Sequence, residues 1–343
     1  MLTNLEALGQ SQPALRIALI VPCYNEALAI GQVLTGFRKA LPDAALHVFD
    51  NNSTDDTAAV ARAHGAEVTH VRLRGKGNVV RRMFADVEAD IYIMVDGDAT
   101  YDAAQAPHMI NMLQQHKLDM VIGSRVDDGT NHSTYRPGHR LGNRLLTGSV
   151  LWIFGGHFTD MLSGYRVFSR RYAKSFPASA HGFETETELT VHALELRMPY
   201  AEHPTAYSSR PEGSMSKLST FKDGWRILKT IAKLVISEKP LEFFSLLALL
   251  LALISIGMAI PIALTYLELG VVPRLPTAVL TTGTMLSALL SLVCGAVLNT
   301  VTLGRREAKW LAYLGTPGPR VTCAQDAAKH GAPMPAVSNA AAL

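Results

Sequence analysis

The sequence predicts an α/β domain with a mainly parallel sheet, followed by two membrane-spanning helices that form a hairpin. Short buried-type strands alternate with helices over the first hundred residues, which is typical of a parallel sheet with helices on both faces. Farther along, about 25 uncharged residues separate Glu242 from Glu268, and about 30 separate Arg274 from Arg305. Each stretch is long enough to cross a bilayer, and neither has the polar face expected of a long buried core helix.

The composition excludes some classes of function. Of the 343 residues, 48% are hydrophobic and 18% charged, and the formal net charge is only +3. Without a basic stripe interleaved with aromatic residues, this small charge argues against a nucleic-acid partner. Cys23, Cys294 and Cys323 have no metal-binding spacing and form no even framework, which fits a reducing compartment.

The charges beside the hydrophobic stretches predict the topology. The N-terminus shows no export signal, and Arg305, Arg306 and Lys309 follow the second stretch, whereas the short loop between the stretches carries only Arg274. By the positive-inside rule we expect a multi-pass protein of the cytoplasmic (inner) membrane. Its α/β domain and both termini would then lie in the cytoplasm.

These patterns divide the chain into five segments. They are a leader (1–14), the α/β domain (15–218), a juxtamembrane amphipathic helix (219–240), two transmembrane helices (241–304) and a cytoplasmic tail (305–343). In the juxtamembrane helix, apolar residues alternate with lysines and arginines, as in a helix on an anionic membrane surface; packing against the α/β domain is the alternative. The tail is rich in Ala, Pro and Gly, which predicts disorder.

Polar residues follow the first two predicted strands, 17–21 and 46–49. After the first strand, Tyr24 presents a flat face for a nucleobase and Glu26 a polar edge, although an ordinary turn with a capping acid explains the same residues. After the second, Asp50 could accept a hydrogen bond from a base or ribose. The Ser, Thr and Asp residues that follow it are good N-caps for a helix over 58–63.

Two further motifs predict anion and metal binding. Arg74-Gly-Lys76-Gly-Asn78 opens a helix over 79–88, and a basic, glycine-containing helix N-terminus suits a nucleotide phosphate. A strand over 91–95 ends in Asp96-Gly97-Asp98, where two carboxylates can share Mg²⁺ or Mn²⁺ at the ligand-binding edge of the sheet. The alternative for this second motif is a solvated turn.

Arginines follow the next predicted strand, 119–123. Arg125 lies at its end, and Arg140 and Arg144 share one face of a helix that runs to Phe154, after a polar stretch that is a candidate mobile loop. Together they are a candidate phosphate clamp. For the two helical arginines, the alternative is a solvated helix face.

In this order, the motifs resemble those of the family 2 inverting glycosyltransferases, and within them the polyisoprenyl-phosphate glycosyltransferases such as dolichyl-phosphate mannose synthase. The likeness covers residues 17–239 and extends to the membrane hairpin. It rests on Pro22-x-Tyr-Asn-Glu26, Asp50-x-x-Ser-x-Asp55, Gly75-Lys-Gly77, Asp96-Gly-Asp98, Gly123-Ser-Arg125, Asp160-x-x-Ser-Gly-Tyr-Arg166 and Gly213-x-x-Ser-Lys217.

The resemblance implies a GT-A nucleotide-sugar-binding fold and a role for each matching residue. Asp96 and Asp98 match the metal-binding pair, and Arg125 and Arg140, with Arg144 nearby, match the arginines that hold the acceptor phosphate. Five residues match positions of the nucleoside and diphosphate site: Pro22, Tyr24, Glu26, Asp50 and Lys76. Three more match a region that faces either the diphosphate or the acceptor phosphate: Arg210, Ser216 and Lys217. Asp98, Arg125 and Arg140 are the candidate catalytic residues.

The sequence departs from the family pattern in two places. Thr100 replaces the glutamine that completes the metal shell in the mannose synthases, so that Asp102 or water would have to substitute. Asn51 and Asn52 replace an acidic residue beside Asp50, which leaves the nucleotide open. In a segment that resembles the family's G-F-x-x-x-x-E stretch, where an acid faces the sugar, Glu184 and Glu188 are the candidates on one helical face, and we interpret Glu195 as a solvated charge.

A phosphate acceptor is also reasonable chemically. The second pKa of a phosphate monoester is about 6, so its oxygen is already an anionic nucleophile at neutral pH. We therefore expect metal-dependent sugar transfer from a nucleotide-sugar, with a UDP-sugar favoured over GDP-mannose, to undecaprenyl or another polyprenyl phosphate. The alternatives are a family 2 enzyme with a glycan or sugar-lipid acceptor and a non-catalytic nucleotide-sugar-binding protein; a homo-oligomer stays open.

Overall fold

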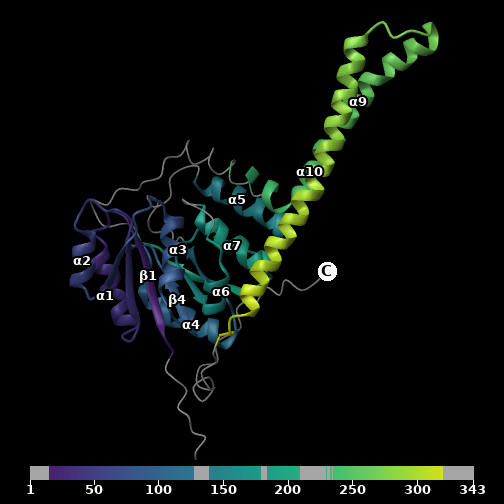
Figure 1. Ribbon diagram of the computed structural model, residues 1–343. Coiled ribbons are helices and arrows are strands. Elements are labelled where there is room, and N and C mark those ends of the chain that lie inside the picture. The colour runs from purple at the N-terminus through teal and green to yellow at the C-terminus, as the bar shows by residue number, and fades with distance from the viewer. Residues whose placement is uncertain are drawn as a thin grey trace, which may run out of the picture. The chain divides into compact units, whose positions relative to one another are not determined.

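The computed structural model describes residues 15–126, 139–178, 184–208, 229, 232–233 and 235–319. The chain divides into two compact units, which Figure 1 shows as parts of one ribbon. Residues 1–218 and 309–343 form the first, called the α/β unit here, and residues 219–308 form the second, the hairpin unit.

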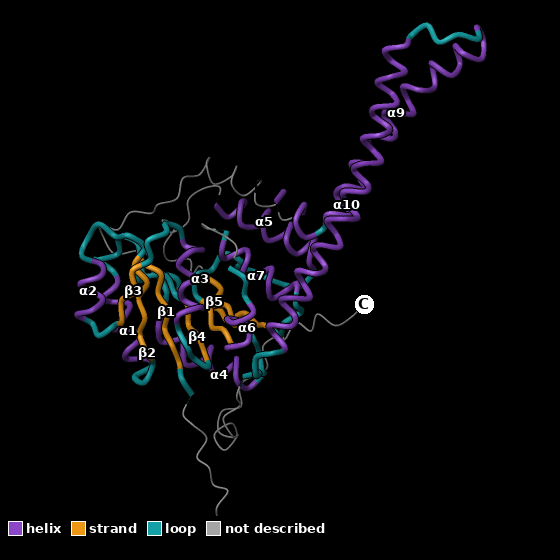
Figure 2. Tube along the Cα trace, viewed as in Figure 1, coloured by secondary structure: helices purple, strands orange, loops and turns teal. Residues whose placement is uncertain are grey.

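The α/β unit is built on a seven-stranded sheet in the order β3-β2-β1-β4-β6-β5-β7 (Figure 2). Strand β6 runs antiparallel to β4 and β5, and the other neighbouring pairs are parallel. The predicted α/β fold with a mainly parallel sheet is therefore confirmed. The strands are β1 (Ile17–Cys23), β2 (Ala45–Asp50), β3 (Glu67–His70), β4 (Ile91–Met94), β5 (Met120–Val126), β6 (Arg166–Ser169) and β7 (Tyr200–Ala206).

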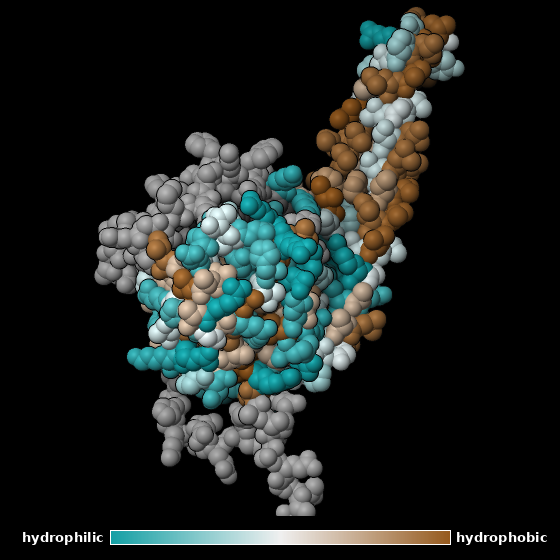
Figure 3. Space-filling model, turned by 60° about the vertical axis from the view of Figure 1, so that its left-hand side comes forward, coloured by the Kyte–Doolittle hydropathy of each residue, from teal (hydrophilic) through white to brown (hydrophobic). Residues whose placement is uncertain are grey.

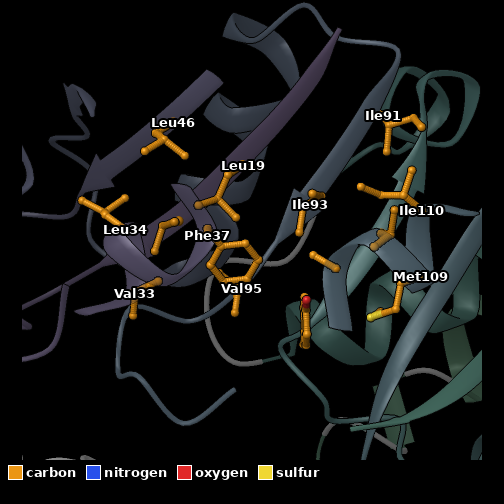
Figure 4. Packing of buried hydrophobic residues seen from close by; sticks show 14 of the residues in the cluster. Leu19, Val33, Leu34, Phe37, Leu46, Ile91, Ile93, Val95, Met109 and Ile110 are labelled. Carbon is orange, nitrogen blue, oxygen red and sulfur yellow. The ribbon is translucent and has the colours of Figure 1, made fainter. Parts of the chain in front are cut away.

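Helices cover both faces of this sheet. On one face, α1 and α4 contribute Leu34, Phe37 and Met109 to a core cluster with Leu19 and Ile93 of the strands (Figure 4). On the other face α3 packs against α6 and α7. The helices are α1 (Ile30–Ala40), α2 (Thr57–Ala63), α3 (Lys76–Asp86), the 3-10 helix η1 (Ala103–Gln105), α4 (Ala106–Gln115), α5 (His139–Phe154), α6 (Arg170–Ser175) and α7 (Thr185–Glu195).

Strands β6 and β7 have no clear signal in the sequence. β6 is only four residues long and begins with Arg166, whose side chain is fully buried. The Arg166 guanidinium donates to the carbonyls of Met161, Ser163 and Glu186 and to the hydroxyl of Thr190. Because these acceptors come from separate segments, an arginine that looks solvent-exposed in the sequence ties α7 to the loop before β6.

The hairpin unit contains α9 (Pro240–Leu269) and most of α10 (Leu275–Leu314), both long and apolar enough to be candidate membrane spans. Figure 3 shows apolar residues along the visible side of both helices. Gly295 permits their close approach, since a Cβ at this position would lie 2.8 Å from the Cβ of Phe244. Within the predicted juxtamembrane helix, residues 229, 232–233 and 235–238 are helical, and its other positions up to 234 lie outside the described residues.

Helix α10 continues ten residues beyond the predicted end of the second span, so residues 305–314 are helical rather than part of a disordered tail. Its last turns belong to the α/β unit. There Lys309 pairs with Glu195 at 2.5 Å, and the hydroxyl of Tyr313 donates to Asp119 at 2.9 Å. The interpretation of Glu195 as a solvated charge is wrong, because its side chain is only 1% exposed.

We expect Glu195→Gln to lower the stability of the α/β unit by about 3 kcal/mol or more, because it leaves the charge of Lys309 buried without its partner. Thermal unfolding of the full chain in detergent, followed by circular dichroism, measures this. The double variant Glu195→Met, Lys309→Met is the control, since replacing both charges with apolar groups removes the penalty. Equal melting temperatures for Glu195→Gln and the natural protein would contradict the prediction.

Candidate functional site

The turn after β1 is held by side chains from the segment after β2. The backbone N–H of Asn25 donates to Ser53, that of Glu26 to Thr57 and that of Ala27 to Asp55. In return the Asn25 side chain accepts from the backbone N–H of Thr54 at 2.8 Å. The Ser, Thr and Asp residues after β2 therefore mainly shape the neighbouring turn, and no side chain caps α2 from its N-cap position.

Asp50 lies at the carboxyl end of β2, as predicted, and is buried. It accepts from the backbone N–H of Ser53, and His70 at the end of β3 lies 3.1 Å from its carboxylate. These contacts fix the orientation of the Asp50 carboxylate at the end of β2. We infer that His70 positions Asp50, a role that the sequence alone did not indicate.

Asn51 and Asn52 have a structural role that explains why neither is acidic. Asn51 donates to the carbonyls of Val71 and Leu73 and accepts from the N–H of Gly75 at 2.7 Å. Asn52 donates to the carbonyls at 71 and 72. A carboxylate can only accept hydrogen bonds, so an acidic residue at either position could not donate to these carbonyls. Asn51 and Asn52 thereby fasten the loop that leads to Lys76.

That loop also reaches the predicted nucleobase platform. The guanidinium of Arg74 lies 5.8 Å from the centre of the Tyr24 ring, within the range of a cation–π contact. Pro22, Tyr24 and Glu26 thus follow one another at the carboxyl end of β1, with a basic side chain beside the aromatic ring. This is an arrangement suited to a flat, anionic ligand.

Lys76 forms the centre of the site. Its ammonium group pairs with Asp96 and with Glu186 of α7, each at 2.5 Å. Burial disfavours the charged form of Lys76, but the two carboxylates outweigh it and raise its pKa above the ordinary value, so the side chain stays a cation. Glu186 is itself 7% exposed, and its second carboxylate oxygen is buried without a hydrogen-bond partner among the described residues.

Glu186 is the functional candidate that the sequence did not single out. We expected Glu184 or Glu188 to face the site, but both are only half-buried, whereas Glu186 is buried against Lys76. The three acids occupy every second position of this segment. The rotation of α7 about its own axis relative to α3 decides which of them faces Lys76. No local signal in the sequence distinguishes Glu186 from the other two acids, because its cationic partner Lys76 becomes a neighbour only on folding.

Asp96 packs directly over Gly164. A Cβ at position 164 would lie 2.2 Å from a carboxylate oxygen of Asp96, so this position has no room for a side chain. The N–H of Gly164 donates to the hydroxyl of Tyr101 at 2.9 Å, and burial raises the pKa of Tyr101, which keeps that hydroxyl neutral. The loop before β6 is thereby fitted to the Asp96 side chain.

Asp98 is oriented by the residue that departs from the family pattern. The hydroxyl of Thr100 donates to the buried Asp98 carboxylate at 2.6 Å, and the backbone N–H of Thr100 contacts the same oxygen at 3.3 Å. Between them Ala99 has a φ of 58°, a left-handed conformation that costs a non-glycine residue energy. Asp102, the suggested substitute metal ligand, instead caps η1 by accepting from the N–H of Ala104.

Arg125 is held by a carboxylate. Its guanidinium forms two hydrogen bonds with Asp160, at 2.6 and 2.8 Å, and lies 5.4 Å from the centre of the Tyr207 ring. This bidentate pair fixes the plane of the guanidinium. Asp160 and Tyr207 are therefore supporting residues whose role the sequence did not predict.

The remaining predicted residues are placed only in part. Arg140 and Arg144 lie on α5, whose backbone is described there while their side chains are not. Arg210, Ser216 and Lys217 lie outside the described residues, as does the candidate mobile loop 127–138. The predicted roles of these five residues in binding the donor diphosphate or the acceptor phosphate stay predictions.

The donor atoms fit a hard divalent cation in part. Asp96 and Asp98 supply carboxylate oxygens at the end of β4, the ligand type that Mg²⁺ and Mn²⁺ prefer. Among the residues that the structure describes, no three His, Cys, Asp or Glu side chains converge on a common point. A cation here would complete its shell with water and ligand phosphate oxygens, as Mg²⁺ commonly does.

Comparisons with known proteins identify the family. The model of glycosyl transferase family 2 matches residues 18–176. Glycosyltransferase AglJ of Haloferax volcanii is 33% identical over 72% of this chain and 81% of its own length. A dolichyl-phosphate hexose transferase of the same organism is 26% identical over 65% of this chain and 95% of its own length. The chain belongs to glycosyltransferase family 2.

A solved structure supports the GT-A-type fold independently. Glucosyl-3-phosphoglycerate synthase from Mycobacterium tuberculosis, in complex with Mn²⁺, UDP and glucosyl-3-phosphoglycerate, superimposes with a TM-score of 0.51 at 21% identity. The match covers 64% of this chain and 80% of the synthase. The chain is thus a glycosyltransferase whose α/β unit has the GT-A-type fold followed by two candidate membrane spans.

We expect Lys76→Met to destabilise the α/β unit by about 3 kcal/mol or more, because it leaves the buried carboxylate of Glu186 and the partly buried carboxylate of Asp96 without their shared cation. The measurement is thermal or denaturant unfolding of the full chain in detergent. Arg82→Met on the same helix is the matched control: its pair with Asp86 is exposed, so its loss should change stability by less than about 0.5 kcal/mol. Similar losses for both variants would contradict a central role for Lys76.

Proposed function

We propose that this glycosyltransferase moves a sugar from a nucleotide-sugar to a polyprenyl phosphate at the cytoplasmic face of the inner membrane. One observation carries the proposal: a cluster of acidic and basic side chains at the carboxyl edge of a GT-A-type sheet occurs in a chain with two helices of bilayer-spanning length. The similarity to a dolichyl-phosphate hexose transferase supports a lipid-phosphate acceptor. The candidate spans would keep the enzyme at the membrane in which such an acceptor is embedded.

The donor side of the site suits a nucleoside diphosphate sugar. Tyr24 offers a ring for the base, Asp50 an acceptor for base or ribose hydrogens, and Arg74 and Lys76 positive charge for the diphosphate. Pro22 and Glu26 complete the β1 turn, and Arg210 and Lys217 are proposed to add charge. We favour a UDP-sugar over GDP-mannose, since the synthase of the same fold was crystallised with UDP.

Asp96 and Asp98 are proposed to hold Mg²⁺ or Mn²⁺ against the diphosphate. When bound, the cation supplies positive charge to the leaving nucleoside diphosphate. Thr100 keeps Asp98 in one orientation, and Lys76 provides a second, permanent positive charge beside Asp96. The protein therefore presents the leaving group with charges that are already in position, which lowers the cost of reorganisation in the transition state.

The acceptor needs alignment rather than activation. An oxygen of the lipid phosphate attacks the anomeric carbon, a new C–O bond forms there, and the bond from that carbon to the diphosphate oxygen breaks on the opposite side. The nucleoside diphosphate leaves with the electron pair, and the configuration inverts. Because the nucleophile is already anionic, Asp98 does not have to remove a proton.

The arginines reduce the repulsion between the two anions. Arg125, held in position by Asp160, is proposed to contribute positive charge to the acceptor-phosphate site, together with Arg140, Arg144 and Ser216. A guanidinium whose orientation is fixed is a geometrically specific source of positive charge for a phosphate. This arrangement favours a phosphate acceptor over a neutral glycan hydroxyl.

We further infer that Glu186, rather than Glu184 or Glu188, is the acid that faces the donor sugar. One of its carboxylate oxygens is buried and has no partner within the described part of the chain, so a sugar hydroxyl could donate to it, and Lys76 links Glu186 to Asp96. An unsatisfied buried acceptor costs about 1–3 kcal/mol, and a hydroxyl donor from the ligand would remove that cost. Glu186 is thus proposed to contribute to sugar binding.

The test of the function is to incubate the detergent-purified chain with undecaprenyl phosphate, Mg²⁺ or Mn²⁺ and a panel of UDP- and GDP-sugars. We expect one donor to yield a sugar-phosphate-polyprenol, detected by mass spectrometry. The product should disappear with chelator and in Asp98→Ala, because both remove the charge that stabilises the leaving diphosphate. Nucleotide binding without transfer from any donor would overturn the proposal and point to another acceptor or to a binding protein.

We expect Glu186→Gln to lower kcat/KM for the donor by at least about tenfold, as expected when a hydrogen bond to a charged group worth about 1.5–3 kcal/mol is lost. Steady-state kinetics with the donor found above measure this. Glu188→Gln, two residues away on the same helix, is the matched control. A larger loss in Glu188→Gln than in Glu186→Gln would assign the sugar-facing role to Glu188.

A further inference from the structure

Tyr101 lies between the donor side and the acceptor side of the candidate site. Its hydroxyl oxygen accepts from the backbone N–H of Gly164 at 2.9 Å, and the carboxylate of Asp96 packs against the same glycine. The charged side chains that act on this hydroxyl are Arg125 and Asp96. Because the first is proposed for the acceptor phosphate and the second for the metal, Tyr101 is placed where the two substrates meet.

Backbone pairing and ring packing hold Tyr101 in this position. It pairs with Tyr207 in an isolated antiparallel bridge just beyond β7, and the N–H of Ser208 donates to the carbonyl of Thr100 at 2.9 Å. The rings of Tyr101 and Tyr207 are 5.3 Å apart, and the Arg125 guanidinium lies 5.4 Å from the centre of the Tyr207 ring. The segment that follows the two site carboxylates of β4 is thus fastened to the strand beside Arg125.

The proton of the Tyr101 hydroxyl has no strong acceptor within the protein. Besides the N–H of Gly164, which is a donor, its hydrogen-bonding partner among the described residues is the hydroxyl of Ser163, at 3.5 Å. This is beyond the range of about 2.5–3.0 Å that is usual between two hydroxyl oxygens. Ser163 itself donates to the carbonyl of Gly123 at 2.6 Å and accepts from the N–H of Tyr165. Tyr101 therefore presents an O–H group that a ligand can use.

A neutral donor suits a phosphate in a site that already holds several charges. Burial raises the pKa of Tyr101, so the side chain keeps its proton at neutral pH. A hydrogen bond from a hydroxyl to an ionised phosphate oxygen is charge-assisted, and hence stronger than one between neutral groups. Unlike a further arginine, the hydroxyl adds no positive charge that would repel a cation held by Asp96.

We propose that the Tyr101 hydroxyl donates a hydrogen bond to a phosphate oxygen of a bound substrate. The diphosphate of the donor and the phosphate of the acceptor both offer such an oxygen, and a position between Asp96 and Arg125 suits either. The identity of these two ligands rests on the proposed function, whereas the O–H group without a strong acceptor is a property of the fold.

Binding to the full chain in detergent tests this role without catalysis. One probe is UDP with Mn²⁺, and the other is geranyl phosphate, a short, water-soluble prenyl phosphate. Tyr101→Phe keeps the ring and removes the hydroxyl, so we expect at least one probe to bind about tenfold more weakly, the loss typical of a hydrogen bond to a charged group. A loss for UDP alone assigns the hydrogen bond to the donor diphosphate, and a loss for geranyl phosphate alone assigns it to the acceptor.

Tyr165→Phe is the matched control. The Tyr165 ring packs against that of Tyr101, but its hydroxyl is buried and has no hydrogen-bond partner within the described part of the chain. Its removal should therefore change neither affinity. Unchanged affinities in Tyr101→Phe, or equal losses in the two variants, would overturn the proposal.

A second variant separates ligand binding from a structural effect, since Tyr101→Phe also deprives the Gly164 N–H of its acceptor. With 3-fluorotyrosine at position 101 the ring and hydroxyl remain, but the more acidic phenol donates a stronger hydrogen bond and accepts a weaker one. We expect the affected probe to bind more tightly to this chain. Weaker or unchanged binding would assign Tyr101 a structural role and overturn the proposal.

Sugar transfer by the same chains distinguishes the two proposals. Transfer by the natural chain, with unchanged probe affinities in Tyr101→Phe, would refute the role of Tyr101 alone. Loss of affinity in that variant, without transfer from any donor by the natural chain, would refute the proposed function alone. Failure of the natural chain to bind either probe would overturn both.

Discussion

The candidate site depends on the charge of Lys76, which lies between the carboxylates of Asp96 and Glu186. Without this cation, α3, the end of β4 and α7 would bring together a buried acid, Glu186, and a partly buried one, Asp96, with no positive charge between them. With it, the acidic residue proposed for the metal and the one proposed for the sugar are held in one network. A buried ion pair contributes little net stability, so its value here is that it sets the positions of groups from three separate elements.

The loops at the carboxyl edge are shaped by polar side chains rather than by packing. Asn51 and Asn52 fasten the loop that carries Lys76, and Ser53, Asp55 and Thr57 hold the turn after β1. Each of these contacts satisfies a backbone group that regular secondary structure leaves unpaired. The left-handed Ala99 shows the same principle at the end of β4, where the surrounding structure holds a strained residue between two functional ones.

The arginines of the α/β unit divide into two kinds. Arg166 is fully buried and donates its hydrogen bonds to carbonyls and a hydroxyl inside the fold, and burial lowers its pKa. Arg125 lies at the edge of the sheet, where Asp160 holds one side of its guanidinium. The first joins segments of the protein, and the second is the one proposed to contribute charge to an anionic ligand. In the sequence both are simply arginines near strand ends.

The sequence by itself determined the sheet from β1 to β5, the long helices of the hairpin, and the carboxylate pair at the end of β4, because hydrophobic periodicity and strand-end position are local signals. It could not show β6 or β7, since a short strand that begins with a buried arginine has no distinct local pattern. Nor could it show that Glu186 points inward, because this acid is one of three at alternating positions. The partners of Asn51, Arg125 and Glu195 lie 20 to 114 residues away and become neighbours only on folding. Tertiary structure alone decided which charges are buried, and therefore which of them must be paired.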